Sequence, residues 1–98
     1  MLRKTYTKTG RFCWVTFDLT PQIDAKVVSL CGEFNDWNPT SHLMKRRKGG
    51  RFSATISLKA GQLYRFRYLL DGRRWENDWA ADGYVPNCFG TEDSVAKI

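Results

Sequence analysis

The sequence is poor in the residues on which most enzymes and metal sites depend. It holds one histidine, His42, and three widely spaced cysteines, with no C-x-x-C pair or Cys/His cluster. A zinc site needs several such ligands at short spacing, so we expect none, and a lone histidine is typically structural or solvated. The chain also lacks a G-x-S-x-G motif and a G-x-x-x-x-G-K phosphate loop. We therefore predict no catalytic activity, metal or cofactor.

Long apolar stretches are missing as well. No run of about 20 apolar residues could span a bilayer. The N-terminus, M-L-R-K, is not followed by the apolar region of a signal peptide. Because the number of cysteines is odd and no pairing pattern is visible, a reducing cytoplasm is the expected compartment.

Positive charge is in excess, with a formal net charge of +6 over 98 residues. Such an excess raises nucleic acid or an anionic membrane as a partner. The basic residues are scattered, however, apart from the run K-R-R-K at residues 45–48. Because Gly49 and Gly50 follow this run, we expect a solvated hairpin turn, with a nucleic-acid patch as the alternative.

Apolar and polar residues alternate along most of the chain, and no helical period of useful length is present. The alternation predicts seven short strands, at residues 11–19, 25–31, 42–47, 51–58, 63–70, 73–76 and 94–98. The first strand should end at residues 20–22, and Asp71-Gly72 signals a hairpin. Seven short strands favour an all-β, immunoglobulin-like β-sandwich, with a small barrel as the alternative.

The domain organisation is simple. We expect a polar N-terminal arm at residues 1–10, followed by a single domain at residues 11–98. Within this domain the alternation weakens after residue 76, and residues 79–87 are expected to form an ordered loop.

Three of the four tryptophans lie in or beside turns, close to amides and carboxylates. They are Trp37, Trp75 and Trp79. An indole face can stack on the apolar C–H face of a sugar, while polar neighbours hydrogen-bond its hydroxyls. Each ring could instead plug the core or brace a hairpin, and Trp14, on a strand, is expected to pack. A glucose unit would contribute only about 3 kcal/mol, so an oligosaccharide is the sensible ligand.

Four motifs, in order, carry a family resemblance. They are V-x-L-x-G-x-F-N-x-W-x-P (28–39), F-x-A-x-I-x-L (52–58), L-x-x-G-x-x-Y (58–64) and F-R-Y-x-x-D-G-x-x-W (66–75). Together they make residues 11–96 resemble the family 48 carbohydrate-binding modules. These include the glycogen-binding domain of the AMP-activated protein kinase β subunit and the N-terminal domains of isoamylases and branching enzymes. The resemblance implies an immunoglobulin-like β-sandwich that binds α-1,4-linked glucans, such as glycogen or starch, without catalysis.

The resemblance also implies which residues bind sugar. Trp37 and Trp75 match the two stacking tryptophans, and Arg67 stands where the family has a hydroxyl-binding lysine. A terminal L-G-T-x-N segment has weaker matches, namely Phe89 in place of Leu, Thr91 itself and Asp93 in place of Asn. Residues 79–87 depart from the short D-P segment of the enzyme-fused members. This segment is either a structural extension or one that adds Trp79 to the ligand surface.

Three functions stay open at this stage. The first is a stand-alone α-glucan-binding module. The second is an interaction domain that docks on a glycogen-metabolism enzyme or kinase and has lost sugar binding, because Trp, Tyr and Arg also suit protein hot spots. The third is a single-stranded nucleic-acid binder, because aromatic rings and arginines can stack on bases.

Overall fold

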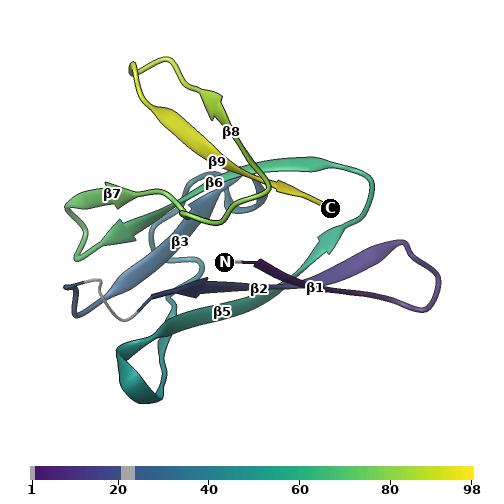
Figure 1. Ribbon diagram of the computed structural model, residues 1–98, viewed down its shortest axis with the longest axis horizontal. Helices are drawn as coiled ribbons and strands as arrows, with labels where there is room; N and C mark the ends of the chain where they lie inside the picture. The colour runs from purple at the N-terminus through teal and green to yellow at the C-terminus, as the bar shows by residue number, and fades with distance from the viewer. Residues whose placement is uncertain (1, 21–23) are drawn as a thin grey trace.

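The computed structural model describes residues 2–20 and 24–98, which form two antiparallel sheets (Figure 1). The first sheet has the order β1 (Leu2–Tyr6), β2 (Phe12–Leu19), β5 (Phe52–Lys59) and β4 (Lys45–Arg46). The second has the order β3 (Val28–Gly32), β6 (Leu63–Leu70), β9 (Glu92–Lys97) and β8 (Gly83–Pro86), with β7 (Arg74–Glu76) paired to β6. The predicted all-β sandwich is confirmed, with nine strands in the described residues where we expected seven.

The core lies between the sheets and follows the alternation read from the sequence. In β2, Cys13, Val15 and Phe17 are fully buried, and in β6 Phe66 and Tyr68 are fully buried. The Phe17 and Phe66 rings meet edge to face across the two sheets, with their centroids 4.9 Å apart. Burial of these large side chains stabilises each sheet only when the other covers it, because the inner face of each would otherwise contact water.

Two strands were not anticipated. Residues 2–6, expected to belong to a polar arm, form the edge strand β1, which pairs with β2 from Leu2 opposite Phe17 to Tyr6 opposite Cys13. Residues 83–86, expected to be loop, form β8, which pairs with β9. Both are edge strands rich in polar residues, glycine or proline, so pairing rather than local pattern determines their conformation.

Other strands differ at their ends. The strand expected at residues 25–31 begins at Val28. The strand expected at residues 42–47 shortens to Lys45–Arg46, and Leu43 makes only an isolated bridge to Ser29. Of the turn expected at residues 20–22, positions 21 and 22 lie outside the described residues. The Asp71-Gly72 turn is confirmed, because both residues have the positive φ angles of a tight hairpin, 52° and 67°.

A strap at residues 77–82 joins β7 to β8 and is tied to both sheets (Figure 1). The buried carboxylate of Asp78 accepts a hydrogen bond from the Tyr68 hydroxyl at 2.7 Å. Asp82 accepts one from Lys4 Nζ of β1 at 2.6 Å. Burial raises the pKa of the Tyr68 phenol well above its ordinary value, and Asp78 raises it further. The strap therefore holds β8 and β9 in place beside β1.

Within residues 2–20 and 24–98, we find no helix with the length and apolar character needed to cross a bilayer.

Candidate functional site

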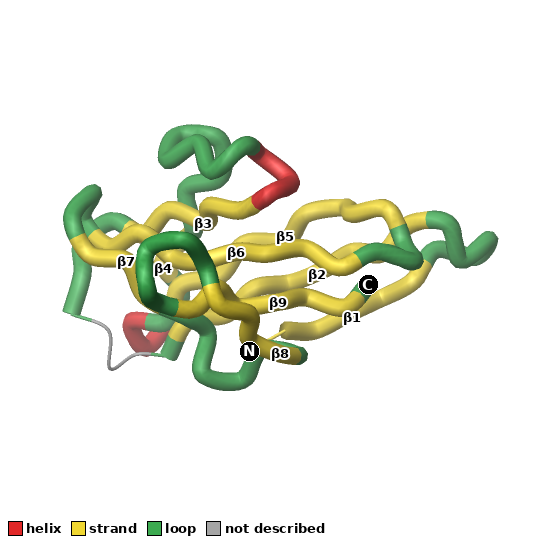
Figure 2. The backbone as a smooth tube through the Cα atoms, turned by 90° about the horizontal axis from the view of Figure 1, so that it is seen from above, coloured by secondary structure: helices red, strands yellow, loops and turns green. Residues whose placement is uncertain are grey.

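The turn after β3 is organised by the side chain of Asn35. Its Nδ2 donates to the carbonyl of Leu30 at 2.9 Å, and its Oδ1 accepts from the backbone N–H of Gly32 at 3.0 Å. Nδ2 is also hydrogen-bonded to His42 Nδ1 at 2.8 Å. His42 therefore has the structural role expected of a lone histidine. Figure 2 shows the resulting short helical turn, Glu33–Asn35, directly after β3.

Within this turn, Phe34 faces inward. Its ring lies 5.8 Å from that of Phe17 and 6.3 Å from that of Tyr64, centroid to centroid. Phe34 thus plugs the loop onto the core. The anchored ring leaves the remainder of the loop free to face solvent.

The next two residues have an unusual backbone. Asp36 and Trp37 both adopt left-handed conformations, with φ angles of 55° and 59°. Side chains other than Gly, Asn and Asp rarely adopt this region, and such strain concentrates at binding sites. The Trp37 N–H donates to the carbonyl of Gly32 at 2.9 Å, which closes the turn. The Trp37 ring is consequently turned away from the core and is half-buried.

Trp75, on strand β7, lies beside Trp37. It lies opposite Leu69 in the β6–β7 pairing, on the outer face of the second sheet, and is 43% exposed. The rings of Trp37 and Trp75 lie 6.4 Å apart with a 76° angle between their planes. Arg67, two residues before Leu69, places its guanidinium 5.7 Å from the centre of the Trp75 ring. The two tryptophans therefore form a corner, not a flat platform.

This corner is part of a hollow of about 970 Å³, which we call the groove. Its volume falls within the range of ligand pockets, roughly 300–1,000 Å³. The groove brings together six of the seven residues predicted to bind sugar, namely Trp37, Trp75, Arg67, Phe89, Thr91 and Asp93. The first three come from the β3–β4 loop, β7 and β6, and the last three from β9 and the turn before it.

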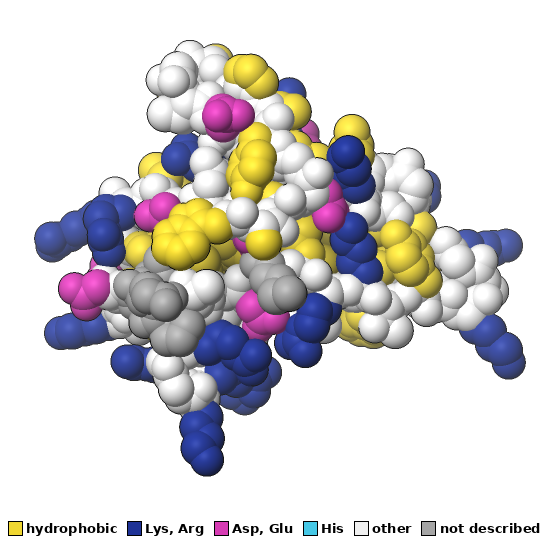
Figure 3. Space-filling view, viewed as in Figure 1, with side chains coloured by type: hydrophobic (Ala, Val, Ile, Leu, Met, Phe, Trp, Pro, Cys, Tyr) yellow, Lys and Arg dark blue, Asp and Glu magenta, His cyan; other side chains and the backbone are white. Residues whose placement is uncertain are grey.

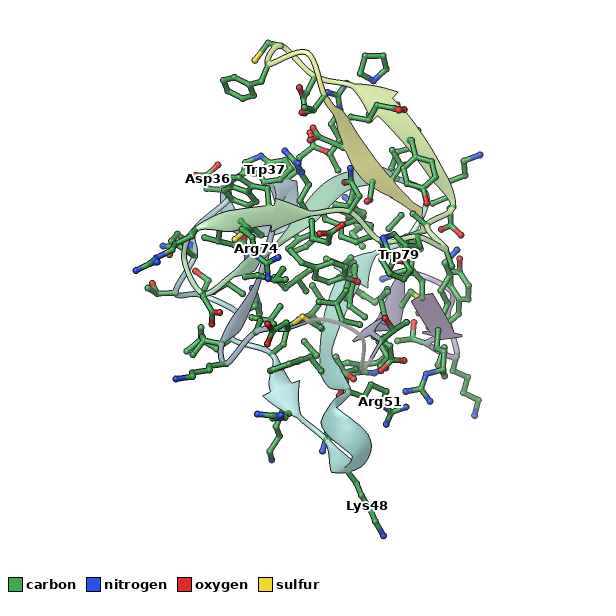
Figure 4. The ribbon with its side chains drawn as sticks, turned by 60° about the vertical axis from the view of Figure 1, so that its left-hand side comes forward. Asp36, Trp37, Lys48, Arg51, Arg74 and Trp79 are labelled. Carbon is green, nitrogen blue, oxygen red and sulfur yellow. The ribbon has the colours of Figure 1, made fainter. Side chains whose placement is uncertain are left out.

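Trp79, the seventh predicted residue, does not line the groove. It lies on the strap and is 66% exposed, and Figure 4 shows it apart from Trp37. Trp14 also differs from expectation. We expected it to pack, but it is 52% exposed on the outer face of the first sheet, opposite Thr5 and Ser57. The pattern identified the strand face of Trp14 but not whether anything covers it.

Four lining residues were missed from the sequence, namely Glu33, Arg65, Asn87 and Cys88. Arg65 had a readable signal, because it shares a strand face with Arg67. Glu33 accepts a hydrogen bond from the backbone N–H of Arg65 at 2.7 Å, a contact between distant segments that no local pattern reveals.

The charges that line the groove cancel. Two carboxylates, Glu33 and Asp93, face two guanidinium groups, Arg65 and Arg67. Arg65 Nη1 lies 3.9 Å from Asp93 Oδ2, and Arg67 Nε is buried with no hydrogen-bond partner among the described residues. The groove thus offers both donors and acceptors without net charge, which suits an uncharged polyhydroxylated ligand.

The positive excess lies elsewhere. Lys and Arg side chains project at many places around the molecule (Figure 3). The run at residues 45–48 is exposed at the β4–β5 connection, which confirms the expected solvated turn. Figure 4 shows Lys48 of this run projecting at the end of the molecule opposite Trp37. The basic run and the aromatic groove are therefore separate surfaces.

No group of three His, Cys, Asp or Glu side chains within residues 2–20 and 24–98 could hold a metal ion.

The comparison with protein families gave one finding. A family model described as the glycogen recognition site of AMP-activated protein kinase matches residues 15–87. The matched segment contains Trp37, Arg67 and Trp75 and ends before Phe89. Among curated proteins, no match was found.

Proposed function

The chain belongs to the family of the glycogen recognition site of AMP-activated protein kinase, and we propose that its groove binds one α-1,4-linked glucan chain, stacked on Trp37 and Trp75. The observation that carries this proposal is the corner formed by the half-buried Trp37 ring and the exposed Trp75 ring, 6.4 Å apart on the outer face of the second sheet. Membership of this family also fits binding without catalysis.

The shape of the corner supports a curved ligand. An α-1,4-linked chain bends from one glucose ring to the next, so successive rings can present their apolar faces to two walls that meet at an angle. Stacking removes the apolar faces of both partners from water. The 76° angle between the tryptophan planes suits this geometry better than it suits the flat ribbon of a β-1,4-linked chain.

Polar groups around the corner would bind the sugar hydroxyls. Arg65 and Arg67 can donate hydrogen bonds, and Glu33 and Asp93 can accept them. Because these four charges cancel, the groove has no electrostatic preference for a polyanion. This balance favours a neutral glucan over single-stranded nucleic acid, which needs a positive channel beside its stacking rings.

The ligand should be an oligosaccharide or a polymer. A single glucose ring contributes at most about 3 kcal/mol, which corresponds to binding weaker than millimolar. Two stacked units contribute about 6 kcal/mol by the same reasoning, which corresponds to a Kd of about 10–100 μM. We place this binding in the cytoplasm, since all three cysteines are free thiols.

Affinity electrophoresis in glycogen-containing gels tests the proposal. The wild type should migrate more slowly in glycogen, and Trp37→Ala and Trp75→Ala should each reduce this retardation strongly. Trp14→Ala is the matched control, because it removes an exposed indole of the opposite sheet and should leave the retardation unchanged. Wild-type mobility that glycogen does not alter would refute the proposal. Salt should affect retardation little, whereas nucleic-acid binding would weaken steeply.

The cysteines provide a second assay, based on the rate of their alkylation. Cys88 is exposed and lines the groove, whereas Cys13 and Cys31 are buried, and burial raises the pKa of the Cys31 thiol. Alkylation should therefore occur at Cys88 first. Saturating maltoheptaose should slow this alkylation, and cellohexaose, a β-1,4-linked chain one glucose unit shorter, should not. Equal rates with and without maltoheptaose would show that no glucan covers the groove.

A second candidate function is docking on a glycogen-metabolism enzyme or kinase. The observation that favours it is the exposed pair Phe12 and Trp14, 47% and 52% exposed on the outer face of the first sheet. Exposed aromatic rings are typical of protein hot spots. If a purified candidate enzyme binds the wild type, this candidate requires Trp14→Ala to weaken that complex. Unchanged affinity would reject this face.

A further inference from the structure

The connection between β8 and β9 is held by two sets of hydrogen bonds from Asn87. Its backbone N–H donates to the Thr91 carbonyl at 2.9 Å, and its side chain makes the remaining bonds. Its Oδ1 accepts hydrogen bonds from the backbone N–H groups of Phe89 and Thr91, at 3.0 and 3.2 Å, and from Thr91 Oγ1 at 3.1 Å. Its Nδ2 donates to Thr91 Oγ1 at 2.9 Å and to Asp93 Oδ1 at 3.0 Å. One amide thus ties together three residues that follow it in the chain.

The tip that Asn87 holds carries a ring with almost no protein cover. Phe89 is 83% exposed, the most of any large hydrophobic side chain in the described residues. It nevertheless lines the same groove as Trp37 and Trp75. Burial cannot fix the position of such a side chain, because its own packing against the protein is slight. The place from which the ring projects is therefore set by the backbone of the tip, and the Asn87 side chain bonds that backbone at Phe89 and Thr91.

We propose that Asn87 is a positioning residue of the groove, which holds the β8–β9 tip so that Phe89 stands as a third apolar wall before any ligand arrives. This inference rests on the proposed function for its ligand. A preformed wall spares the loss of loop entropy on binding, and a loosened tip would have to be ordered by the glucan itself. Asn87 does not need to touch the sugar to contribute to affinity.

The first test is a double-substitution cycle on maltoheptaose binding, measured by calorimetry. Phe89→Ala and Asn87→Ala should each raise the Kd about 5–10-fold, the usual size of one lost aromatic contact. The double variant should match Phe89→Ala within about twofold, because Asn87 acts through that ring. Multiplicative losses would overturn the proposal, and so would wild-type affinity in Asn87→Ala.

The second test needs no glucan. In the free protein, Asn87→Ala should raise the alkylation rate of Cys88 several-fold, because the tip that carries this thiol loses its clamp. Thr55→Val is the control, since it removes only the hydroxyl pair of Thr16 and Thr55 on the opposite sheet, and its Cys88 rate should not change. If the wild type does not bind maltoheptaose, the proposed function fails alone. An unchanged Cys88 rate in Asn87→Ala overturns the clamp.

A rescue experiment separates the clamp from a general loss of stability. Asn87→Asp places a carboxylate where the amide now donates to Asp93 Oδ1, so the tip should loosen at neutral pH. Adding Asp93→Asn reverses the donor and the acceptor of this hydrogen bond and should return the Cys88 rate to within about twofold of the wild type. A rate that stays at the Asn87→Asp level would contradict the assigned hydrogen bond and the proposal with it.

Discussion

Gly32→Ala tests the packing that supports the groove. A Cβ atom added to Gly32 would lie 2.6 Å from the carbonyl oxygen of Arg65 and 2.7 Å from two ring carbons of Phe34. Real Cβ atoms essentially never approach other heavy atoms within 3.0 Å. The Arg65 carbonyl belongs to β6, which is paired with β3, so it cannot retreat without disturbing the sheet. Phe34 can move only by leaving the core rings that it contacts.

The expected cost is that of overpacking, about 1–3 kcal/mol in the free energy of unfolding. For a domain of this size, each kcal/mol lowers the Tm by about 4–8 °C, so a fall of about 5–20 °C is expected. The substitution should also alter the groove. The carbonyl of Gly32 accepts the Trp37 N–H, so a shift of Phe34 and this turn moves the Trp37 ring. We expect weaker maltoheptaose binding in the fraction that stays folded.

Thermal unfolding followed by circular dichroism measures the effect. Gly83→Ala is the matched control, since Gly83 is also a strand glycine, but the nearest atom to its added Cβ is Lys97 Cε at 3.9 Å. That variant should keep its Tm or raise it slightly, because alanine restricts the unfolded chain more than glycine does. A Tm of Gly32→Ala within about 2 °C of the control, under half a kcal/mol, would refute the packing argument.

Three further predictions concern other parts of the molecule. Trp37→Ala and Trp75→Ala should each raise the Kd for maltoheptaose about tenfold, which is about 1.4 kcal/mol of binding free energy. The double variant should lose less binding free energy than the sum of the two, because each ring orients the other. Additive losses in calorimetry would contradict a shared corner. Two backbone N–H donors hold the pKa of the Asp71 carboxyl below its ordinary value, so its stabilising effect is present above about pH 3.9 and lost as the pH falls through the lowered pKa. The wild type should therefore be more stable than Asp71→Asn at pH 7 and converge with it in acid, and parallel urea-unfolding curves at all pH values would be the contrary result. Tyr68→Phe should reduce the free energy of unfolding by about 1–3 kcal/mol, because the buried carboxylate of Asp78 loses a hydroxyl donor, and an unchanged urea midpoint would count against that contact.

Much of the sandwich could be predicted because apolar and polar residues alternate along its strands, so that one face of each strand meets the core and the other meets water. Cys13, Val15 and Phe17 repeat every second residue, and they are the residues that the core buries. The Asp71-Gly72 pair could be assigned for a similarly local reason, since few residue pairs tolerate two positive φ angles. Such features depend on neighbours in the chain, so the sequence alone determines them.

Edge strands were not predictable on the same grounds. β1 and β8 lack a clean apolar alternation, because each has a partner on one side only and much of its surface meets water. Their conformation comes from hydrogen bonds to β2 and β9, whose positions depend on the completed sheets. Trp14 shows a second limit of the sequence pattern. Alternation predicts on which face of the sheet a residue lies, but not whether another part of the protein packs against that face.

For the groove, the family motifs identified in the sequence were sufficient to name Trp37 and Trp75, but the sequence left open whether each ring packs inward or faces a ligand. Their 6.4 Å separation and the 76° angle between them were decided by the tertiary structure. These quantities depend on the pairing of β6 with β3, β7 and β9, which brings distant segments together. The sequence alone determines which residues are available for a binding surface. Their arrangement depends on the relative positions of the strands, which only the packed sheets determine.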